Sequence, residues 1–205
     1  MHCFSKKRGF TLVELIVVMA IATIIMTALV VQQSQWNDSL VVSTQAYELV
    51  LMIRQAQIYS LGVREDTAGT ESDKFNIGYG VYIDINTPDR YIFFADRDSD
   101  EIYTSGDGQP IETKIFTRGV TIDRICGIHQ GNSNPACSPW RQLSKIDISF
   151  FRPEPKANLS FIDDNNHTVN PLDPPVTIYL KSPGGKQYEI SIEISGEISV
   201  TPVTP

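Results

Sequence analysis

Four aspartates in the stretch DRDSDEIYTSGD have the spacing of a calcium-binding loop. Such a loop takes oxygen ligands at its first, third, fifth and twelfth positions, which here are Asp96, Asp98, Asp100 and Asp107. The sixth position is Glu101, where calcium loops have the glycine that a sharp turn needs. The spacing therefore predicts calcium as a cofactor, while a solvated acidic loop without a metal fits the same residues.

A single carboxylate, Glu14, interrupts the otherwise uncharged apolar run of residues 10–31. This run is long enough to cross about 30 Å of hydrocarbon at about 1.5 Å per residue. A charge inside a bilayer costs at least about 2.5 kcal/mol, so it is normally retained for a reason. Glu14 either has a partner within the membrane or reaches back to water at the membrane surface.

The remaining polar residues show no pattern typical of a catalytic site. The three histidines, His2, His129 and His167, are far apart in the sequence, and no nucleophile elbow, phosphate loop or metalloprotease helix is present. The formal net charge is −7. Because phosphate contacts need clustered Lys and Arg, this acidic chain is a poor candidate for binding nucleic acid.

The basic residues Lys6, Lys7 and Arg8 stand directly before the apolar run. By the positive-inside rule, the segment before the run stays in the cytoplasm and the chain after residue 31 lies across the membrane. The sequence QQSQWNDS follows the run and contains no small-residue cleavage site of the secretory type. We therefore expect the run to be retained as a membrane anchor.

The stretch KKRGFTLVELIVVMAIATII resembles the class III leader of type IV prepilins and type II secretion pseudopilins. The resemblance rests on Gly9, Phe10, Thr11, Leu12 and Glu14, which match the motif together. It implies that a prepilin peptidase cuts between Gly9 and Phe10 and methylates the new amine of Phe10. It also implies that Glu14 pairs with the N-terminal ammonium of a neighbouring subunit as the helices pack into a filament.

This resemblance implies a structural pilin-like subunit, a minor pilin or pseudopilin rather than an enzyme. Its expected partners are other pilin subunits, the prepilin peptidase, the inner-membrane assembly platform and lipid. It would lie in the cytoplasmic membrane as a single-pass protein before joining an extracellular or periplasmic filament. The ending VTIYLKSPGGKQYEISIEISGEISV is similar in pattern to minor pseudopilins of the fimbrial-tip type.

Two other functions stay open at this point. One is a filament-tip module that binds DNA or a surface, and the other is a membrane-anchored enzyme or sensor that carries the same leader. Loss of residues 1–9 removes three of the 17 basic residues and none of the 24 acidic ones, which gives 14 − 24 = −10 for the mature chain. This charge argues against DNA as the partner.

The sequence predicts a long N-terminal helix. After the leader (1–9) and the membrane half (10–31), residues 32–62 contain no proline and reach their first glycine at Gly62, a typical helix end. A break near Asn37 is an alternative, because Asn37 and the next residue could cap a second helix. Apolar residues expected on one face of this half are Trp36, Leu40, Tyr47, Val50, Leu51 and Ile58.

Residues 63–205 read as a head rich in β-strands. Apolar residues alternate with a period of two in FNIGYGVYID, KIDISFF and VTIYL, and shorter strands are expected in RYIFFAD, TKIFT, GVTIDRI and GEISV. The sequence Pro183-Gly184 suits the centre of a type II turn in a hairpin. One long helix packed on antiparallel sheet is an α+β fold, the architecture that the resemblance also implies.

Three cysteines become an even pair once the leader is removed. Cys3 leaves with residues 1–9, while Cys126 and Cys137 remain on the side of the membrane where disulfides form. The stretch GIHQGNSNPA between them is rich in turn residues and poor in apolar ones. We predict a disulfide, because two cysteines with His129 do not complete a zinc site.

Overall fold

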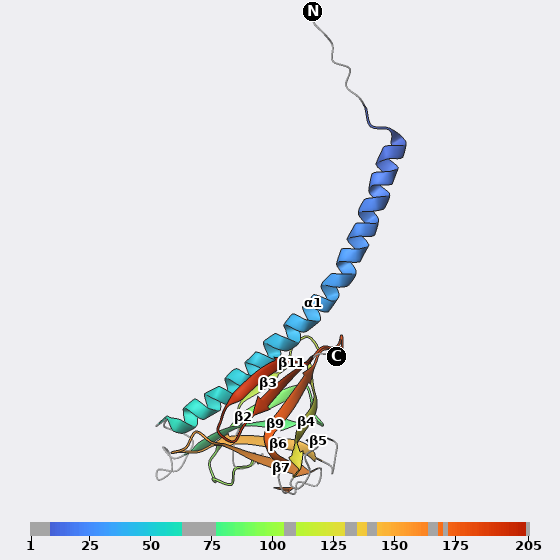
Figure 1. The fold of residues 1–205 in the computed structure, drawn as a ribbon. Coiled ribbons are helices and arrows are strands. Elements are labelled where there is room, and N and C mark those ends of the chain that lie inside the picture. Colours follow the sequence, from blue (N-terminus) through green and yellow to red (C-terminus); the bar gives the residue numbers. More distant parts are fainter. Residues whose placement is uncertain are drawn as a thin grey trace, which may run out of the picture. The chain divides into compact units, whose positions relative to one another are not determined.

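The computed structural model describes residues 9–62, 77–104, 110–129, 135–138, 143–163, 168–169 and 172–203. The chain divides into two compact units, Met1–Asn37 and Asp38–Pro205. The predicted Asp107 lies outside the described residues. Figure 1 shows the elements that make up each unit, and the second unit contains all the strands.

Helix α1 covers Leu12–Leu61, and its 50 residues contribute to both units. It continues through Asn37 without a break, so the alternative of a second helix starting there is wrong. It ends where the N–H of Gly62 donates to the carbonyl of Ile58, at the predicted glycine. One uninterrupted helix therefore includes both the apolar run and the first residues of the second unit.

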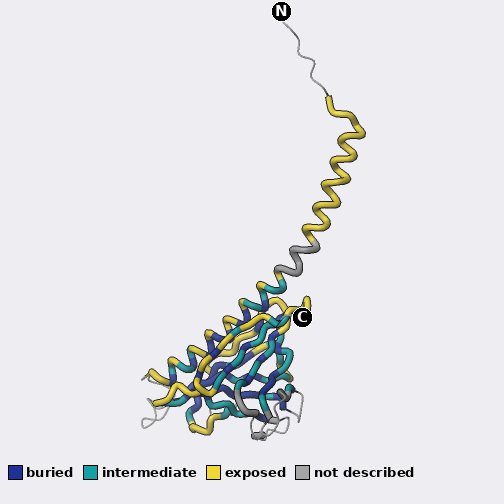
Figure 2. Tube along the Cα trace, in the orientation of Figure 1, coloured by how far each residue is buried: buried dark blue, intermediate teal, exposed yellow. Residues whose placement is uncertain are grey.

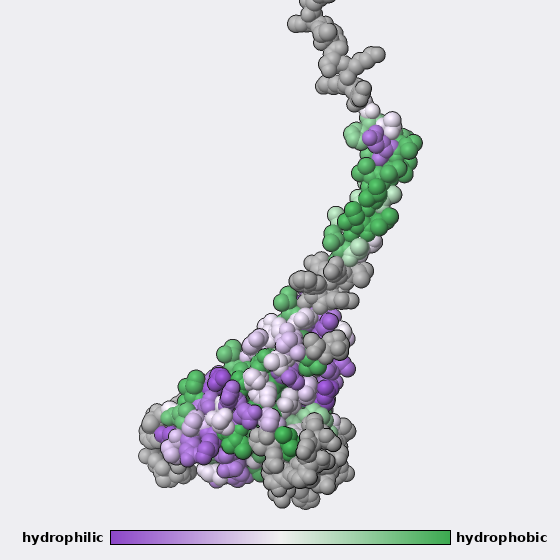
Figure 3. All heavy atoms as spheres, in the orientation of Figure 1, coloured by the Kyte–Doolittle hydropathy of each residue, from purple (hydrophilic) through white to green (hydrophobic). Residues whose placement is uncertain are grey.

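The first part of α1 is apolar on every side. The segment Leu12–Val30 is long and apolar enough to span a membrane, with mean hydropathy 2.6, and none of it is buried. Figure 3 shows hydrophobic side chains covering this part of the helix. Only a surrounding of lipid or of other helices removes such side chains from water.

The described strands of the second unit form two antiparallel sheets. Sheet A has the order β3-β2-β1-β6-β7-β8, and sheet B has the order β11-β10-β9-β4-β5. Period-two alternation places the apolar residues of each strand on one face of its sheet. The strands are β1 Gly78–Asp84, β2 Arg90–Asp96, β3 Pro110–Ile115, β4 Thr121–His129, β5 Pro135–Cys137, β6 Leu143–Phe150, β7 Ala157–Asp163, β8 Thr168–Val169, β9 Leu172–Lys181, β10 Gln187–Ile192 and β11 Ile198–Pro202. This arrangement confirms the predicted α+β fold of the pilin type.

One hydrophobic core joins the second half of α1 to both sheets. Most residues of α1 that enter it recur every three or four positions, and the full set is Val42, Ala46, Leu49, Val50, Met52, Ile53 and Ala56. Sheet A contributes Val81, Phe93 and Ile148 among others, and sheet B contributes Ile178 and Ile190. Figure 2 shows the same contrast, with buried residues in the head and exposed ones along the first part of the helix.

Most residues predicted to share one face of α1 recur on one side of it, but that side is not the one that packs on the sheets. Leu40, Tyr47, Leu51 and Ile58 are exposed, and only Val50 of the described set is buried. Residues 49–53 are apolar on all sides, so the sequence pattern does not say which face packs on the head. The second half of α1 therefore has an apolar inner face and a row of exposed apolar side chains outside it.

The turn between β9 and β10 also differs from the prediction. The N–H of Gly185 donates to Ser182, but the left-handed residue is Gly185, at φ 84°, and not Gly184 as a type II turn requires. A tight turn followed by a left-handed glycine matches the right-handed twist of hairpin strands. Gly184 itself approaches Asp38 of α1 so closely that a side chain there would overlap it.

Two neighbouring leucines of α1 test this assignment of faces. Leu49→Ala should lower the free energy of unfolding by about 2–5 kcal/mol, because the side chain is fully buried and leaves a cavity. Leu51→Ala should change it by less than about 0.5 kcal/mol, since 67% of Leu51 is exposed. Thermal unfolding of the full chain in detergent, followed by near-UV circular dichroism, measures both. Equal losses would contradict the assignment.

Candidate functional site

The carboxylate of Glu14 lies at the start of α1, next to the predicted cleavage point. The N–H of Glu14 donates to the hydroxyl oxygen of Thr11 at 3.3 Å, and that hydroxyl donates to the Glu14 carboxylate at 3.5 Å. Thr11 is therefore the N-cap of the helix, with Glu14 three residues later. Gly9 and Phe10 precede this cap and lie outside the helix.

This cap gives Glu14 a partner within its own chain. A negative charge in the first turn also interacts favourably with the positive end of the helix dipole. The sequence TLVE contains the capping-box pattern, which is the sequence signal for this role of Thr11. The carboxylate is exposed, and it is therefore accessible to a second partner.

The structure brings Asp96, Asp98 and Asp100 together after strand β2. One carboxylate oxygen from each lies within 4.8 Å of the others. Asp96 is buried, and its two oxygens accept the N–H groups of Ser99 at 2.8 Å and Glu101 at 2.9 Å. Three of the four predicted calcium ligands thus face a common point.

The backbone of this loop makes a sharp turn, although the sequence has no glycine at the sixth position. Glu101 has φ 68° and Ser99 has φ 60°, which are left-handed conformations. Glu101 thus takes the conformation usually supplied by glycine at the sixth position of a calcium loop, and its N–H bond to Asp96 holds it there. The presence of Glu101 in place of glycine therefore does not prevent this loop geometry.

The loop covers a second buried carboxylate, Asp147 of strand β6. The N–H of Tyr103 donates to Oδ1 of Asp147 at 3.2 Å, whereas Oδ2 accepts no hydrogen bond from the described part of the chain. The ring of Tyr103 packs against Tyr82 at 4.9 Å and Phe94 at 5.5 Å between centroids. These contacts hold the acidic loop against the outer face of sheet A.

The carboxyl groups beneath this loop are buried and close together, which disfavours their charged forms. Burial raises the pKa of Asp147 to about 8, although the N–H of Tyr103 lowers it, and the charges of Asp100 and Asp96 add to the rise. Burial also raises the pKa of Asp96 to about 7, with Asp98 as a further cause. A bound divalent cation would offset this repulsion, so the donor set suits a hard, oxygen-preferring metal.

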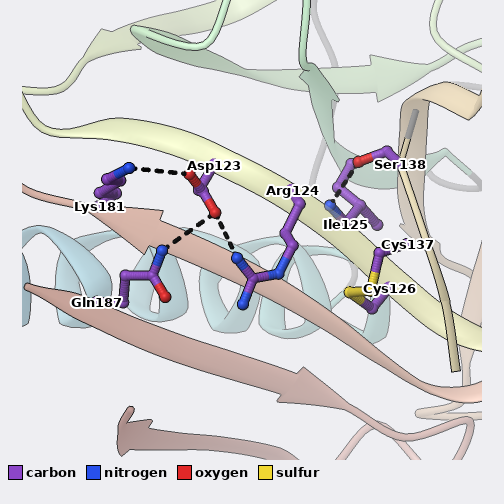
Figure 4. A network of polar contacts seen from close by, with 8 residues as sticks. All are labelled: Asp123, Arg124, Ile125, Cys126, Cys137, Ser138, Lys181 and Gln187. Atoms are coloured by element: carbon purple, nitrogen blue, oxygen red, sulfur yellow. Dashed lines mark hydrogen bonds and ion pairs between the residues drawn. A yellow bond between two sulfur atoms is a disulfide. The ribbon is translucent and has the colours of Figure 1, made fainter. Parts of the chain in front are cut away.

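The predicted disulfide is present in the structure. Cys126 of β4 and Cys137 of β5 face each other across the strand pair and are bonded (Figure 4). Ser138 extends this connection, because its hydroxyl accepts the N–H of Ile125 and its own N–H donates to the carbonyl of Ile125. The short strand β5 is thus held to the edge of sheet B by covalent and polar contacts.

A polar cluster lies on β4 beside this disulfide. Asp123 pairs with Arg124 and Lys181 and accepts a hydrogen bond from Gln187 (Figure 4). The guanidinium of Arg124 lies 4.0 Å from the centre of the Tyr179 ring, a cation–π contact. All these groups are partly exposed and mutually paired, which is the arrangement of a structural surface network.

Residues 4–30 match the family model described as the prokaryotic N-terminal methylation motif. No curated protein and no solved structure matches the chain. The match covers the basic residues, Gly9, Phe10 and Glu14, together with the apolar start of α1. The chain therefore carries a class III prepilin-type leader followed by an apolar helix, the N-terminus of pilin-like subunits that are processed by prepilin peptidase.

Proposed function

We propose that this protein is a minor pilin or pseudopilin of a type IV pilus or a type II secretion pseudopilus, and that it acts as a structural subunit without enzymatic activity. The observation that carries the proposal is the methylation motif at residues 4–30, directly joined to an apolar helix. The pattern of the last strands, similar to minor pseudopilins, supports the finer assignment.

Assembly in this proposal takes place through α1. Its first part, Leu12–Val30, has no apolar side chain buried within the chain. Its second part exposes the row of Leu40, Tyr47, Leu51 and Ile58. Helices of neighbouring subunits would cover these side chains. The inner-membrane platform would drive this packing, with the head on the extracytoplasmic side as the basic residues before the run predict.

Glu14 has a specific role in this assembly. After cleavage before Phe10, each chain has a new N-terminal ammonium close to the start of its helix. Pairing between this ammonium and the Glu14 of a neighbour would replace the weak contact with Thr11, whose distance is 3.5 Å. A charge pair removed from water is favourable only when both partners are present, so Glu14 would favour the packed filament over the isolated subunit.

The acidic loop is a proposed calcium site within the head. Asp96, Asp98 and Asp100 would supply carboxylate oxygens, and Asp107 would supply the twelfth-position ligand. The left-handed backbone at Glu101 and the closeness of the three carboxylates support this role. Calcium would order the loop on sheet A without taking part in any reaction. A tip module that binds a surface remains the second function, and the net charge of the mature chain, −10 by the count above, disfavours DNA.

Processing is the first test of the proposed function. In cells that contain a prepilin peptidase, the mature protein should begin at N-methylated Phe10, as measured by intact mass and by sequencing of the N-terminal peptide. Gly9→Val should leave the precursor uncut, because a branched side chain hinders access to the scissile bond. Mature protein that still carries residues 1–9, or that begins after residue 31, would refute the proposal.

Substitutions at the start of α1 separate the cap from the intersubunit pair. Glu14→Gln keeps a side chain that suits a capping box but removes the charge, whereas Thr11→Ala removes the cap and keeps the charge. In competition with wild type, Glu14→Gln should reduce incorporation into sheared filaments about tenfold or more, and Thr11→Ala should have a much smaller effect. Equal incorporation of Glu14→Gln and wild type would contradict the pairing.

Calcium binding predicts a higher melting temperature in calcium than in chelator, because a ligand that binds only the folded state stabilises it. Asp98→Ala should remove this difference, since Asp98 is exposed and contributes mainly as a ligand. Asp89→Ala is the control, because Asp89 lies outside the loop with its side chain 46% exposed and paired with Arg90, and this variant should keep the difference. Identical melting of the wild type in both conditions would leave a solvated acidic loop as the correct interpretation.

A further inference from the structure

Two basic turns lie side by side at one end of the second unit. The first, at residues 117–120, follows strand β3, and the second, at residues 182–186, joins β9 to β10. Gly119 approaches the second turn so closely that a side chain at this position would overlap it. Each turn presents one exposed cation, Arg118 in the first and Lys186 in the second.

Both turns are held against the part of α1 that enters the head first. The N–H of Thr117 donates to the side-chain oxygen of Gln45 at 2.9 Å. Gly184 packs directly against the carboxylate of Asp38, which is the first residue of the second unit. The two turns therefore lie at the end of the head from which the chain continues to the apolar segment.

The length of the chain keeps this end of the head near the membrane surface. Asp38 follows Val30, the last residue of the apolar span, by 38 − 30 = 8 residues, which is about 12 Å of helix. The headgroup layer takes up about 5–8 Å of this distance. The remainder is shorter than the Debye length of about 8 Å at physiological ionic strength, so charges at Asp38 interact with charged lipid. Trp36 stands within this connection, and tryptophan is enriched at membrane interfaces.

Positive charge exceeds negative charge around the two turns. Within the described part of the chain, neither Arg118 nor Lys186 forms an ion pair. Lys181, beside the second turn, makes only a long contact of 3.7 Å with Asp123 (Figure 4). The charges in this region sum to 4 − 2 = +2, from Arg118, Arg124, Lys181 and Lys186 against Asp38 and Asp123.

The acidic loop lies at the opposite end of the head. The N–H of Phe116 donates to the carbonyl of Asp89, so strand β2 begins beside the first basic turn. The strand then extends about 20 Å, at about 3.4 Å per residue, to Asp96 and the acidic loop. Strand β10 likewise leads from the second basic turn to residues 193–197, which include two glutamates. Although the mature chain has a net charge of −10, the end of the head next to the anchor is thus positive.

We propose that Arg118 and Lys186 bind the headgroups of anionic lipids on the side of the membrane where the head lies. An anionic bilayer attracts basic residues next to a membrane anchor, and this attraction falls off within a Debye length. The contact keeps the basic end of the head at the lipid surface in a subunit that is not assembled, with the acidic loop directed away from it. This inference rests on the anchoring of α1 in a membrane and not on the proposed filament.

Fluorescence quenching of the full chain in lipid nanodiscs tests this contact. In a Cys3→Ser background, Thr117→Cys takes a fluorophore at the first turn, and Ser195→Cys takes it at the opposite end of β10. The discs are either anionic or zwitterionic, and both contain a lipid with a quencher on its headgroup. Quenching at residue 117 should be several-fold stronger in anionic discs. It should fall to the zwitterionic value at 1 M salt, where the Debye length is about 3 Å, and residue 195 should show little quenching throughout.

Two double variants with the same loss of charge separate the turns from the net charge. Arg118→Gln with Lys186→Gln should lower quenching at residue 117 to the zwitterionic value. Arg152→Gln with Lys156→Gln is the matched control, because the backbone next to Lys156 is bonded to the turn at residues 193–197, away from the basic turns. This control should keep the quenching of the parent protein, and circular dichroism verifies that both variants are folded.

Three results would overturn the proposal. The first is equal quenching at residue 117 in anionic and zwitterionic discs, and the second is an equal loss of quenching in the two double variants. The third is a variant of Arg118 and Lys186 that enters filaments poorly but keeps its quenching, because these side chains then contact a neighbouring subunit instead of lipid. None of these results changes the outcome of the processing test, so the two proposals can fail separately.

Discussion

The structure depends on one constraint, which is that a single helix has to satisfy two different environments. In Leu12–Val30 every side of α1 is apolar, so the helix is at low free energy only in lipid or among other helices. In its second half one face closes the core between the sheets, where each large buried side chain contributes about 1.5–3 kcal/mol. Because the helix is continuous, stability of the head and anchoring in the membrane are properties of the same element.

Polar contacts fix how the helix joins the head. The side chain of Gln45 accepts the N–H of Thr117, and the hydroxyl of Ser60 accepts the N–H of Tyr79 while donating to Ala56. Both residues are buried, so loss of either partner would leave an unsatisfied polar group inside the protein. Hydrophobic burial holds the helix on the sheets, and these directional bonds determine its register along them.

Much of this architecture could be predicted from the sequence, and the failures have physical causes. Strands β1 and β6 were predictable because their apolar residues alternate with a period of two. The length of α1 was predictable because no glycine follows its start before Gly62. The buried face of α1 could not be predicted, because Leu49 and Leu51 differ only in what packs against them, which periodicity does not encode. The buried Asp147 was also missed, because its burial depends on a contact made across the fold. The left-handed Glu101 was missed although its contact with Asp96 is local, because glutamate rarely takes this conformation.

The acidic loop and the start of α1 each contain a carboxylate that is held by contacts within the chain. A carboxylate within the fold needs hydrogen-bond donors or a cation, and both sites supply only part of this requirement. Asp96 receives two N–H groups but lies beside Asp98, and Glu14 receives only the long contact from Thr11. In each case the contacts within the chain position the carboxylate without supplying a positive group. A cation would supply what is missing, and this is the physical basis of the proposed calcium site and of the proposed pairing at Glu14.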